Sequence, residues 1–477
     1  MKYGIMKKIF YKYICSFGTF IVTFFFTQSL SAKDIVITDF GAIADSATLN
    51  TVAIQKAIDI CAETGGGTVT VPSGIFLTGA INLRSHVELY LSRGAVIRGS
   101  LRIPEDYPQR ALIYAENIEN AGISGNGIID GYSNHPSYKE RFRVNDGKRP
   151  RGIFFNHCKR MSLRDIQVRN AGSWTVRLLG CDGVKIDGIS IYCLTQGNND
   201  GIDVDARNVT ISNCNISCDD DGICLKSDLP DFLPENITVT NCVIASNCNP
   251  IKLGTSSYSG FRNIVFSNCV VQRTEESVIW DWAKEYRKVA PGTHTGLSGI
   301  TVQCVDGGII ENISFNNIVL EGIITPIFVC LNHRHGNGGV IRNLQFSNII
   351  AKADGVIPCL ISGVPDARIK GITLRDIVVE HEGGEQAMVE RLPENLKGYP
   401  ENRMYGHRNP AGGLYIRHAD NVLVENFQIY QRHTDYRPAV VLDDVTDFRM
   451  RGLKAIGTET DELLQTIDCN NIKLMDN

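Results

Sequence analysis

The sequence predicts an all-β solenoid in which short parallel strands coil around a single core. One phrase occurs twice, as DGIDV at 200–204 and as DGICL at 221–225, 21 positions apart. Each copy alternates apolar and polar residues, as a strand with one buried face does. A longer phrase recurs as NVTISNCNIS at Asn208, NITVTNCVIA at Asn236 and NIVFSNCVVQ at Asn263. Its intervals of 28 and 27 residues are too long for a hairpin and are typical of one coil of a parallel β-helix.

The segment 1–32 is predicted to be a secretory signal. Four lysines within the first twelve residues precede an apolar run that ends at Phe26, and Ser29-Leu-Ser-Ala32 follows. We expect cleavage near Ala32, which leaves 33–477 as a single β-helix domain that is secreted or periplasmic. A membrane anchor is the alternative, although the apolar run is short for a bilayer span.

One helix is expected near the start of the mature chain, after a first strand and turn at 34–42. Residues 50–64 have helical periodicity, and a helix there would cap the end of the solenoid, where strand edges are otherwise unpaired. The residues expected on its buried face are Ala53, Ile54, Ala57, Ile58 and Cys61. From Gly65 onward short strands alternate with turns rich in Gly, Asn and Asp, and no second long helix is expected.

Composition narrows the class of protein. The net charge of −4 argues against nucleic acid as a partner, and no later segment is apolar enough to insert into a membrane. Fourteen of the fifteen cysteines lie beyond the leader and form no CxxC metal pattern, so we expect stacked interior thiols and leave one or two disulfides open. The repeat aligns two columns: Asn213, Asn241 and Asn268, and Cys214, Cys242 and Cys269. Each asparagine amide is expected to bond the backbone of the next coil.

Three aspartates are expected to gather at the repeated phrase. If its two copies stack, Asp200 and Asp221 lie above one another on adjacent strands, roughly 4.8 Å apart, and Asp220 stands beside the second. Like charges held this close oppose folding, which points to a chemical use. A solvated acidic turn is the alternative.

This region resembles glycoside hydrolase family 28, the polygalacturonase family of right-handed parallel β-helices that cleave pectin. The family's Asn-Thr-Asp motif reads Asn198-Asn199-Asp200 here, and its Asp-Asp motif, about one coil later, reads Asp220-Asp221. The opening FGA, the segment TVAIQKAID and the segment GGGTVTVPSG also resemble the family, so the resemblance covers nearly the whole mature chain. The fold that it implies is the right-handed solenoid that pectin lyases share.

The resemblance implies hydrolysis by single displacement with inversion. Asp220 would protonate the leaving oxygen, while Asp200 and Asp221 would hold and deprotonate a water across a gap of roughly 6.5–9.5 Å. The neighbouring Asp219 and Asp221 are expected to raise the pKa of Asp220 above its usual value of about 3.9. Two or three carboxylates suffice for this reaction, so we expect neither a cofactor nor a metal.

Two positions depart from the family pattern. Asn249 stands where the Gly-His-Gly motif of the family has its histidine, which rhamnogalacturonan hydrolases of the family also lack. Gly299-Ile300-Thr301 stands where the family has an Arg-Ile-Lys motif that grips a galacturonate carboxylate. Both departures weaken the expectation of an ordinary endo-polygalacturonase.

Five residues are candidates for substrate binding: Asp203, Lys226, Asn249, Lys252 and Arg334. Strand alternation puts Asp203 on the same face as Asp205, towards the sugar. Lys226 and Lys252 share the strand column of the catalytic face, and each is expected either to meet a uronate carboxylate or to neutralise the acidic cluster. Arg334, in the phrase NHRHG, can bind a carboxylate by a bidentate fork, whereas the spacing of the histidines beside it does not fit a helical zinc site.

Two segments break the coil pattern. The segment 280–294 is polar and aromatic, and Trp280 or Trp282 is expected either to stack on a sugar ring or to pack its loop on the β-helix. The long loop 382–413 is expected to be functional or mobile. Such an arm would wall off one end of a groove and favour the removal of single terminal residues.

We therefore expect an enzyme that hydrolyses α-galacturonosyl linkages in a pectic polysaccharide or oligosaccharide, and that is exo-acting or directed at rhamnogalacturonan. The alternatives are an endo-polygalacturonase, a pectate lyase whose acidic trio binds Ca²⁺ through oxygen ligands, and a non-catalytic carbohydrate-binding β-helix. The sequence leaves the oligomeric state and the pairing of the cysteines open.

Overall fold

The computed structural model describes most of the chain, in five stretches: residues 34–138, 148–274, 296–388, 391–406 and 408–475. All of these residues belong to one compact unit, Ala32–Asn477. The predicted signal at 1–32 and the polar segment 280–294 lie outside the described residues. Within the described stretches, no helix combines the length and the apolar character that a bilayer span requires.

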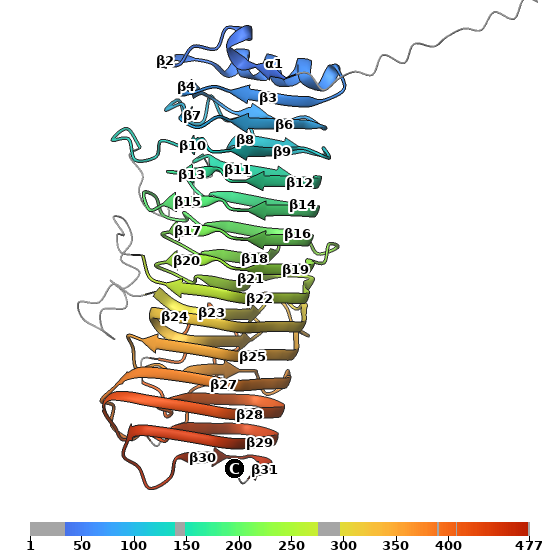
Figure 1. The fold of residues 1–477 in the computed structure, drawn as a ribbon. Coiled ribbons are helices and arrows are strands. Elements are labelled where there is room, and N and C mark those ends of the chain that lie inside the picture. Colours follow the sequence, from blue (N-terminus) through green and yellow to red (C-terminus); the bar gives the residue numbers. More distant parts are fainter. Residues whose placement is uncertain (1–33, 139–147, 275–295, 389–390, 407, 476–477) are drawn as a thin grey trace, which may run out of the picture. The chain divides into compact units, whose positions relative to one another are not determined.

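The unit is an all-β, right-handed parallel β-helix, as predicted (Figure 1). Its strands are β1 (Ile35–Val36), β2 (Asp45–Leu49), β3 (Gly67–Val71), β4 (Gly74–Thr78), β5 (Ile81–Asn82), β6 (Val87–Leu91), β7 (Ala95–Gly99), β8 (Ala111–Glu116), β9 (Gly122–Gly125), β10 (Ile128–Asp130), β11 (Arg151–Asn156), β12 (Lys159–Arg164), β13 (Gln167–Arg169), β14 (Val176–Asp187), β15 (Ser190–Cys193), β16 (Ile202–Ser212), β17 (Asn215–Cys218), β18 (Ile223–Ser227), β19 (Glu235–Thr240), β20 (Val243–Ser246), β21 (Ile251–Ser257), β22 (Gly260–Gln272), β23 (Gly296–Cys304), β24 (Ile309–Leu331), β25 (Val340–Ala353), β26 (Cys359–Ser362), β27 (Ile369–Gly383), β28 (Leu414–Asp435), β29 (Val440–Thr458), β30 (Leu464–Ile467) and β31 (Asn470–Leu474).

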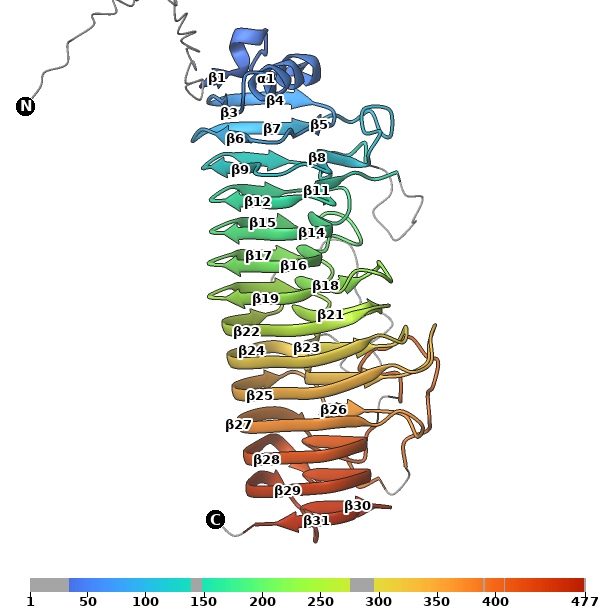
Figure 2. The same cartoon turned by 90° about the vertical axis from the view of Figure 1, so that its right-hand side faces the viewer.

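Backbone hydrogen bonds sort these strands into three parallel ladders, which Figure 2 shows stacked coil upon coil. One of them, which we call the site ladder, contains β5, β8 and β11, the first residues of β14 and β16, and then β18, β21 and β23. In this ladder Ile202 pairs with Ile223, which pairs with Ile251, which pairs with Ile300. Equivalent residues of successive coils therefore form columns although the coils differ in length.

The predicted helical cap is confirmed, but the first strand is shorter than expected. Helix α1 (Thr51–Glu63) lies over the first coil (Figure 1) and buries one face. The residues of that face are Ile54, Ala57, Ile58 and Cys61, while the expected Ala53 is only partly buried. The predicted strand and turn lie within 34–42, but β1 ends at Val36 and a 3-10 helix that was not predicted, η1 (Ile37–Phe40), comes between them. The reason is Gly41, whose φ of 91° closes a tight turn with bonds back to the carbonyls of Ile37 and Thr38.

The predicted asparagine column is present, but its amides bond to side chains, which corrects the expectation of backbone partners. Asn241 Nδ2 donates to Asn213 Oδ1, and Asn268 Nδ2 donates to Thr240 Oγ1, both at 3.4 Å. These three asparagines have φ values of 54–56°, the left-handed region that asparagine tolerates in turns. A second such column, which we call the asparagine ladder, has an amide-to-amide bond of 3.1 Å at every step: Asn208, Asn236, Asn263, Asn312 and Asn343.

The cysteines behave as the stacked interior thiols that were expected. All fourteen described cysteines are free, and every one except Cys469 is buried. The column of Cys214, Cys242 and Cys269 lies inside the coils. No disulfide joins any cysteine of the described stretches, so the core there is held together by packing.

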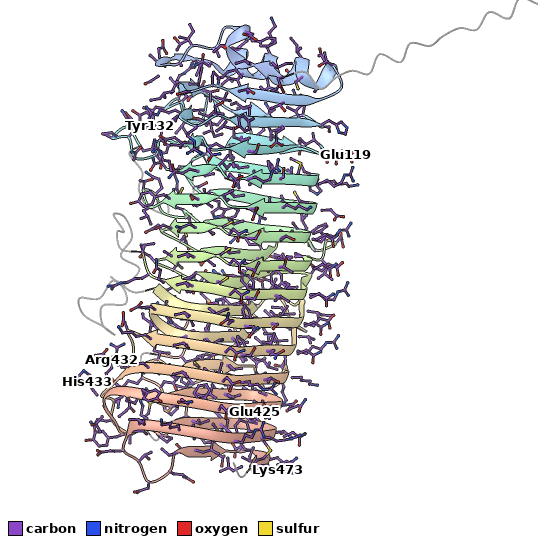
Figure 3. The ribbon with its side chains drawn as sticks, viewed as in Figure 1. Glu119, Tyr132, Glu425, Arg432, His433 and Lys473 are labelled. Atoms are coloured by element: carbon purple, nitrogen blue, oxygen red, sulfur yellow. The ribbon has the colours of Figure 1, made fainter. Side chains whose placement is uncertain are left out.

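The interior of the coils is apolar and layered. Phe315 stacks between Phe266 and Phe346, with ring centroids 5.6 and 5.1 Å away. Figure 3 shows that charged side chains, including Glu119 and Lys473, stand along the outside of the coils instead. Strands with one buried face require this separation of apolar and charged side chains. A buried charge on the site ladder is therefore an exception to the pattern.

Candidate active site

The two copies of the repeated phrase stack as predicted. Asp200 and Asp221 precede β16 and β18 at the same position in successive coils, and Gly201 N–H donates to the carbonyl of Asp221 at 2.8 Å. The next coil repeats this bond onto the carbonyl of Asn249, at 2.9 Å. Asp220 directly precedes Asp221 and is 4% exposed. We call Asp200, Asp220 and Asp221 the acid column.

A cavity of about 480 Å³ opens over the acid column. This volume lies within the range of about 300–1,000 Å³ that is typical of pockets for small ligands. Besides the three aspartates, its lining contains three of the residues predicted to bind substrate, Lys226, Asn249 and Lys252. The other lining residues are Trp174, Asn198, Asp228, Cys248, Thr255, Ser256, Leu297, Tyr399, Pro400 and Glu401.

Both carboxylate oxygens of Asp221 are held by neighbours. Asn249 Nδ2 donates to Oδ1 at 2.9 Å, and Lys252 Nζ donates to Oδ2 at 2.8 Å. Burial by itself raises the pKa of Asp221, but the positive charges of Lys252 and Lys226, together with these two hydrogen bonds, lower it below its usual value. The surroundings of Asp221 therefore favour its ionised form.

Asp200 has a different environment. Lys226 Nζ lies 3.6 Å from Asp200 Oδ2 and closer, at 3.0 Å, to Asp203 Oδ1. Burial raises the pKa of Asp200 well above its usual value, and the charges of Asp203 and Asp220 raise it further. The pKa values of the two stacked carboxyl groups are thus shifted in opposite directions although the repeat places the groups equivalently.

Asp203 and Asp205 lie beneath the cavity and outside its lining. Both are fully buried, and Lys226 covers Asp203, so a sugar in the cavity would meet the lysine before the carboxylate. Burial raises the pKa of Asp203, and it raises the pKa of Asp205 to about 6. The expected direct contact of Asp203 with a sugar does not follow from this arrangement, and its ion pair with Lys226 gives it a structural use.

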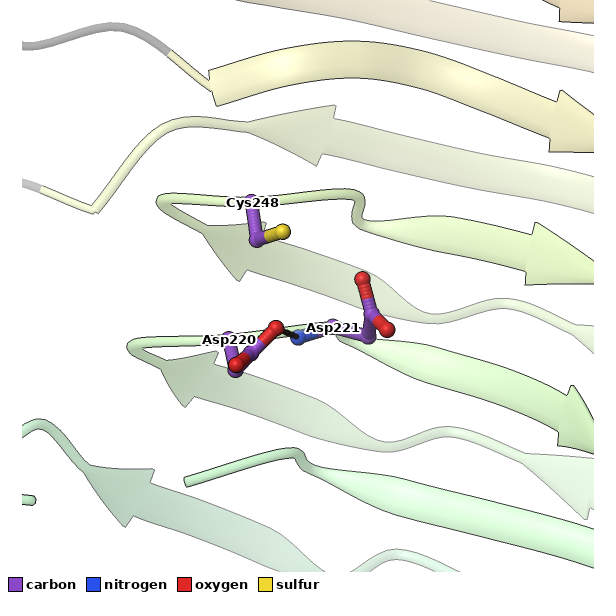
Figure 4. Close-up of side chains that lie close together, drawn as sticks. All are labelled: Asp220, Asp221 and Cys248. Carbon is purple, nitrogen blue, oxygen red and sulfur yellow. Dashed lines mark hydrogen bonds between the residues drawn. The ribbon is translucent and has the colours of Figure 1, made fainter. Parts of the chain in front are cut away.

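Asp220 and Cys248 complete the floor of the cavity (Figure 4). Asp220 Oδ1 accepts a hydrogen bond from the backbone N–H of Asp221 at 3.0 Å, and Asn198 Nδ2 lies 3.4 Å from Asp220 Oδ2. One ligand atom from each of Asp220, Asp221 and Cys248 lies within 4.8 Å of the others, close enough to hold a metal ion. Burial and the nearby carboxylates raise the pKa of the Cys248 thiol well above its usual value, so it is a protonated side chain and a weak ligand.

The predicted arm, 382–413, forms one wall of the cavity. Tyr399, Pro400 and Glu401 line it. Gln303 Nε2 donates to the carbonyl of Pro400 at 2.8 Å, and Asn402 Nδ2 donates to the carbonyl of Leu297 at 2.7 Å. These anchors join the arm to β23 of the site ladder, so the arm is a fixed part of the site.

Arg334 lies beside this wall and outside the cavity lining. Its guanidinium stacks on the ring of Tyr399, 4.8 Å from the centroid, and its side chain is half-buried. The neighbouring His333 and His335 pair with Asp366 and Asp306, at 2.8 and 3.0 Å. The structure therefore brings Arg334 to the rim and not to the acid column.

Trp174 is a cavity residue that the sequence reading missed. Its indole lies under Lys226, 5.0 Å from Nζ, and contacts the guanidinium of Arg177 at 5.3 Å. The predicted alternatives Trp280 and Trp282 lie outside the described residues. The neighbouring Thr175 N–H donates to the carbonyl of Asp200 at 2.9 Å. Trp174 thus stands one coil before the acid column.

The position aligned with the Arg-Ile-Lys motif carries no cation. Thr301 pairs with Lys252 in the site ladder, and its hydroxyl donates to Asn249 Oδ1 at 3.2 Å. Thr301 thus follows Lys252 by one coil.

Comparisons with known proteins point to one family. The model of glycosyl hydrolases family 28 matches residues 61–397. A probable polygalacturonase of Vitis vinifera is 31% identical over 224 residues, which cover 42% of this chain and 45% of that protein. An exo-poly-alpha-D-galacturonosidase of Dickeya chrysanthemi is 23% identical over 437 residues, which cover 78% of this chain and 66% of that protein. This chain therefore spans less than two thirds of the length of both relatives.

Among solved structures, the hyperthermoactive exopolygalacturonase of Thermotoga maritima is similar in fold. It aligns with a TM-score of 0.62 and 22% sequence identity, over 74% of this chain and 88% of that chain. At this identity the likeness concerns the β-helix itself.

Proposed function

Because the chain belongs to glycoside hydrolase family 28, we propose that this glycosidase cleaves α-galacturonosyl linkages of a pectic polysaccharide or oligosaccharide with inversion. The observation that carries the proposal is the acid column, three buried aspartates on the floor of a cavity of about 480 Å³. The names of the relatives, a probable polygalacturonase and an exo-poly-alpha-D-galacturonosidase, support the substrate class.

In the proposed mechanism different aspartates of the acid column carry out the two proton transfers. Asp220 protonates the leaving oxygen, while Asp221 and Asp200 hold the water that attacks from the other face of the sugar. Asp220 and Asp221 are consecutive, yet their carboxyl groups point in different directions (Figure 4). This divergence supports separate roles for them. Asp221 suits the proton acceptor, because Lys252 and Asn249 favour its ionised form.

We further propose that the enzyme is exo-acting or directed at rhamnogalacturonan. Tyr399 and Glu401 of the arm narrow the space beside the acid column, which supports a chain end as the substrate. The uncharged Thr301 stands where polygalacturonases have a carboxylate clamp, which supports a sugar other than galacturonate beyond the scissile bond. An endo-polygalacturonase remains the nearest alternative.

The place of action is also proposed. The lysines and the apolar run within 1–32 support a secreted or periplasmic enzyme. A Ca²⁺-dependent lyase and a non-catalytic carbohydrate-binding β-helix are the other readings of the acid column, and family membership favours hydrolysis over both.

The test is the product pattern from two substrates. Homogalacturonan and rhamnogalacturonan oligosaccharides are incubated with the wild-type protein and with Asp220→Asn, and products are separated by chromatography. We expect free galacturonic acid with a saturated ring, and a loss of about 10²–10⁴-fold in rate in the variant, because the leaving oxygen no longer receives a proton. Asp231→Asn, on an exposed turn outside the cavity lining, is the matched control and should retain the wild-type rate.

Each other outcome contradicts a part of the proposal. A ladder of oligogalacturonides would identify an endo-acting enzyme. An unsaturated product that absorbs ultraviolet light and requires Ca²⁺ would identify a lyase. Full activity of Asp220→Asn would remove that residue from the mechanism, and binding without cleavage by the wild type would indicate a non-catalytic protein.

A further inference from the structure

The two stacked aspartates are equivalent in the repeat but not in their surroundings. We propose that Lys252, aided by Asn249, is a positioning residue that fixes Asp221 as the base of the reaction, whereas Asp200 only orients the attacking water. This inference rests on the proposed function, since a base is needed only if water is the nucleophile.

The first support is the geometry around Asp221. Lys252 Nζ and Asn249 Nδ2 occupy one position on each carboxylate oxygen, at 2.8 and 2.9 Å. The amide of Asn249 is oriented by Thr301, whose hydroxyl donates to Asn249 Oδ1 at 3.2 Å. The NH₂ group must therefore face Asp221. Each carboxylate oxygen keeps a further lone pair for a water.

The second support is the contrast with Asp200. Its one ion pair in the described structure is with Lys226, at 3.6 Å, and that lysine is closer to Asp203, at 3.0 Å. Asp200 Oδ1 has no hydrogen-bond partner among the described protein atoms. Asp200 therefore lacks the pair of donors that holds Asp221, and burial favours its protonated form.

The third support is how Lys252 is covered. Lys252 stands on the outward face of β21, between the core residues Ile251 and Leu253, yet it is only 4% exposed. Tyr399 of the arm lines the same cavity and acts on the charge of Lys252. Because Lys252 and Asp221 are both buried, the attraction between them is stronger than at a surface.

Among the other titratable groups around Asp221 in the described structure, none forms a second ion pair with it. Those that face it or line its cavity are Asp200, Asp203, Asp220, Cys224, Lys226, Cys248, Asp228, Tyr399 and Glu401. Burial raises the pKa of both thiols, so they are neutral. Lys226 is the other cation, and its ion pairs are with Asp203 and Asp200.

The kinetic test is the pH profile of kcat/KM. In Lys252→Met, Asp221 remains buried without its cation, so the acid limb of the profile should move to higher pH by about 1–3 units. Lys252→Arg keeps the charge and should return the limb towards the wild-type position. Asn249→Ala should move it in the same direction by less. Asn249→Ala also serves as the test if Lys252→Met does not fold.

A limb that stays in place in both Lys252→Met and Asn249→Ala, with only kcat reduced, would overturn the inference. A larger shift in Lys226→Met than in Lys252→Met would do the same, because Asp200 would then be the base.

A second readout needs no substrate. In the wild type the lowered pKa of Asp221 contributes stability above its unfolded-state pKa, and this contribution is lost as the pH falls. Without Lys252, burial raises that pKa and stability falls as the pH rises. The difference in Tm between wild type and Lys252→Met should thus widen from about pH 4 to pH 7. A constant difference would contradict the inference, whereas a widening difference in a protein that cleaves no galacturonoside would contradict only the proposed function.

Discussion

The asparagine ladder and the acid column are made by the same repeat, yet they have opposite effects on the fold. In the ladder each amide from Asn236 onward donates to the asparagine of the preceding coil at 3.1 Å, and the side chains are exposed. In the acid column the carboxyl groups are buried, and ionising one of them opposes ionising its neighbours. Two lysines from the following strands, Lys226 and Lys252, are needed to pair with them.

This difference shows what a catalytic carboxylate requires at a stacked position of a solenoid. Stacking a group that is both donor and acceptor adds a hydrogen bond at each coil. Stacking a carboxylate adds repulsion and a desolvation cost. The acid column therefore needs cations beside it, and Lys226 and Lys252 provide them.

The largest expected effect comes from removing the ionisable group of one stacked aspartate. Asp200→Asn should lower kcat/KM by about 10²–10⁴-fold, because the water loses an orienting group, and at the same time should raise Tm at neutral pH. The pKa of Asp200 is raised by burial, so the stability of its protonated form is lost as the pH rises, whereas asparagine stays neutral. Calorimetry between about pH 4 and pH 7 should show an advantage of the variant that grows with pH. An advantage that shrinks with pH would show that the acid column does not oppose folding.

The next effect concerns the arm. Replacing 385–408 with a short Gly-Ser linker should open the cavity, so that long internal products appear beside single sugars. Product chromatography checks this, and an unchanged product pattern would show that the arm does not close the groove. Tyr399→Ala is the second variant if the deletion does not fold, and Tyr436→Ala, a tyrosine outside the cavity lining that is also exposed, is its matched control.

The smallest effect is expected in the asparagine ladder. Asn263 donates to Asn236 and accepts from Asn312, both at 3.1 Å, with a φ of 56°. Asn263→Ala should lower the free energy of unfolding by about 1–2 kcal/mol, since it loses these bonds and strains a left-handed position. Urea unfolding measures it, and kcat/KM should stay unchanged. Asn263→Gly relieves the backbone strain and should lose less; equal losses would assign the whole effect to the hydrogen bonds.

The sequence by itself determined the columns of this protein. Intervals of 28 and 27 residues identify one coil, and parallel strands in register place equivalent residues above one another. That is why the stack of Asp200 on Asp221, the cap α1 and the interior thiols could all be predicted. The 3-10 helix η1 between the first strand and its turn was missed, and the backbone partners of the asparagines were predicted wrongly. Both depend on local dihedral angles, which a repeat interval does not fix.

Only the tertiary structure decided what surrounds the acid column. It placed Tyr399 from the arm and Trp174 from the preceding coil in one cavity, and it paired Lys252 with Asp221 in an ion pair. None of these contacts is periodic, because the arm is not a coil and a lysine side chain can reach several neighbours. The pKa difference between Asp200 and Asp221 depends on burial and on charges a few ångströms away, and these distances exist only once the chain is folded.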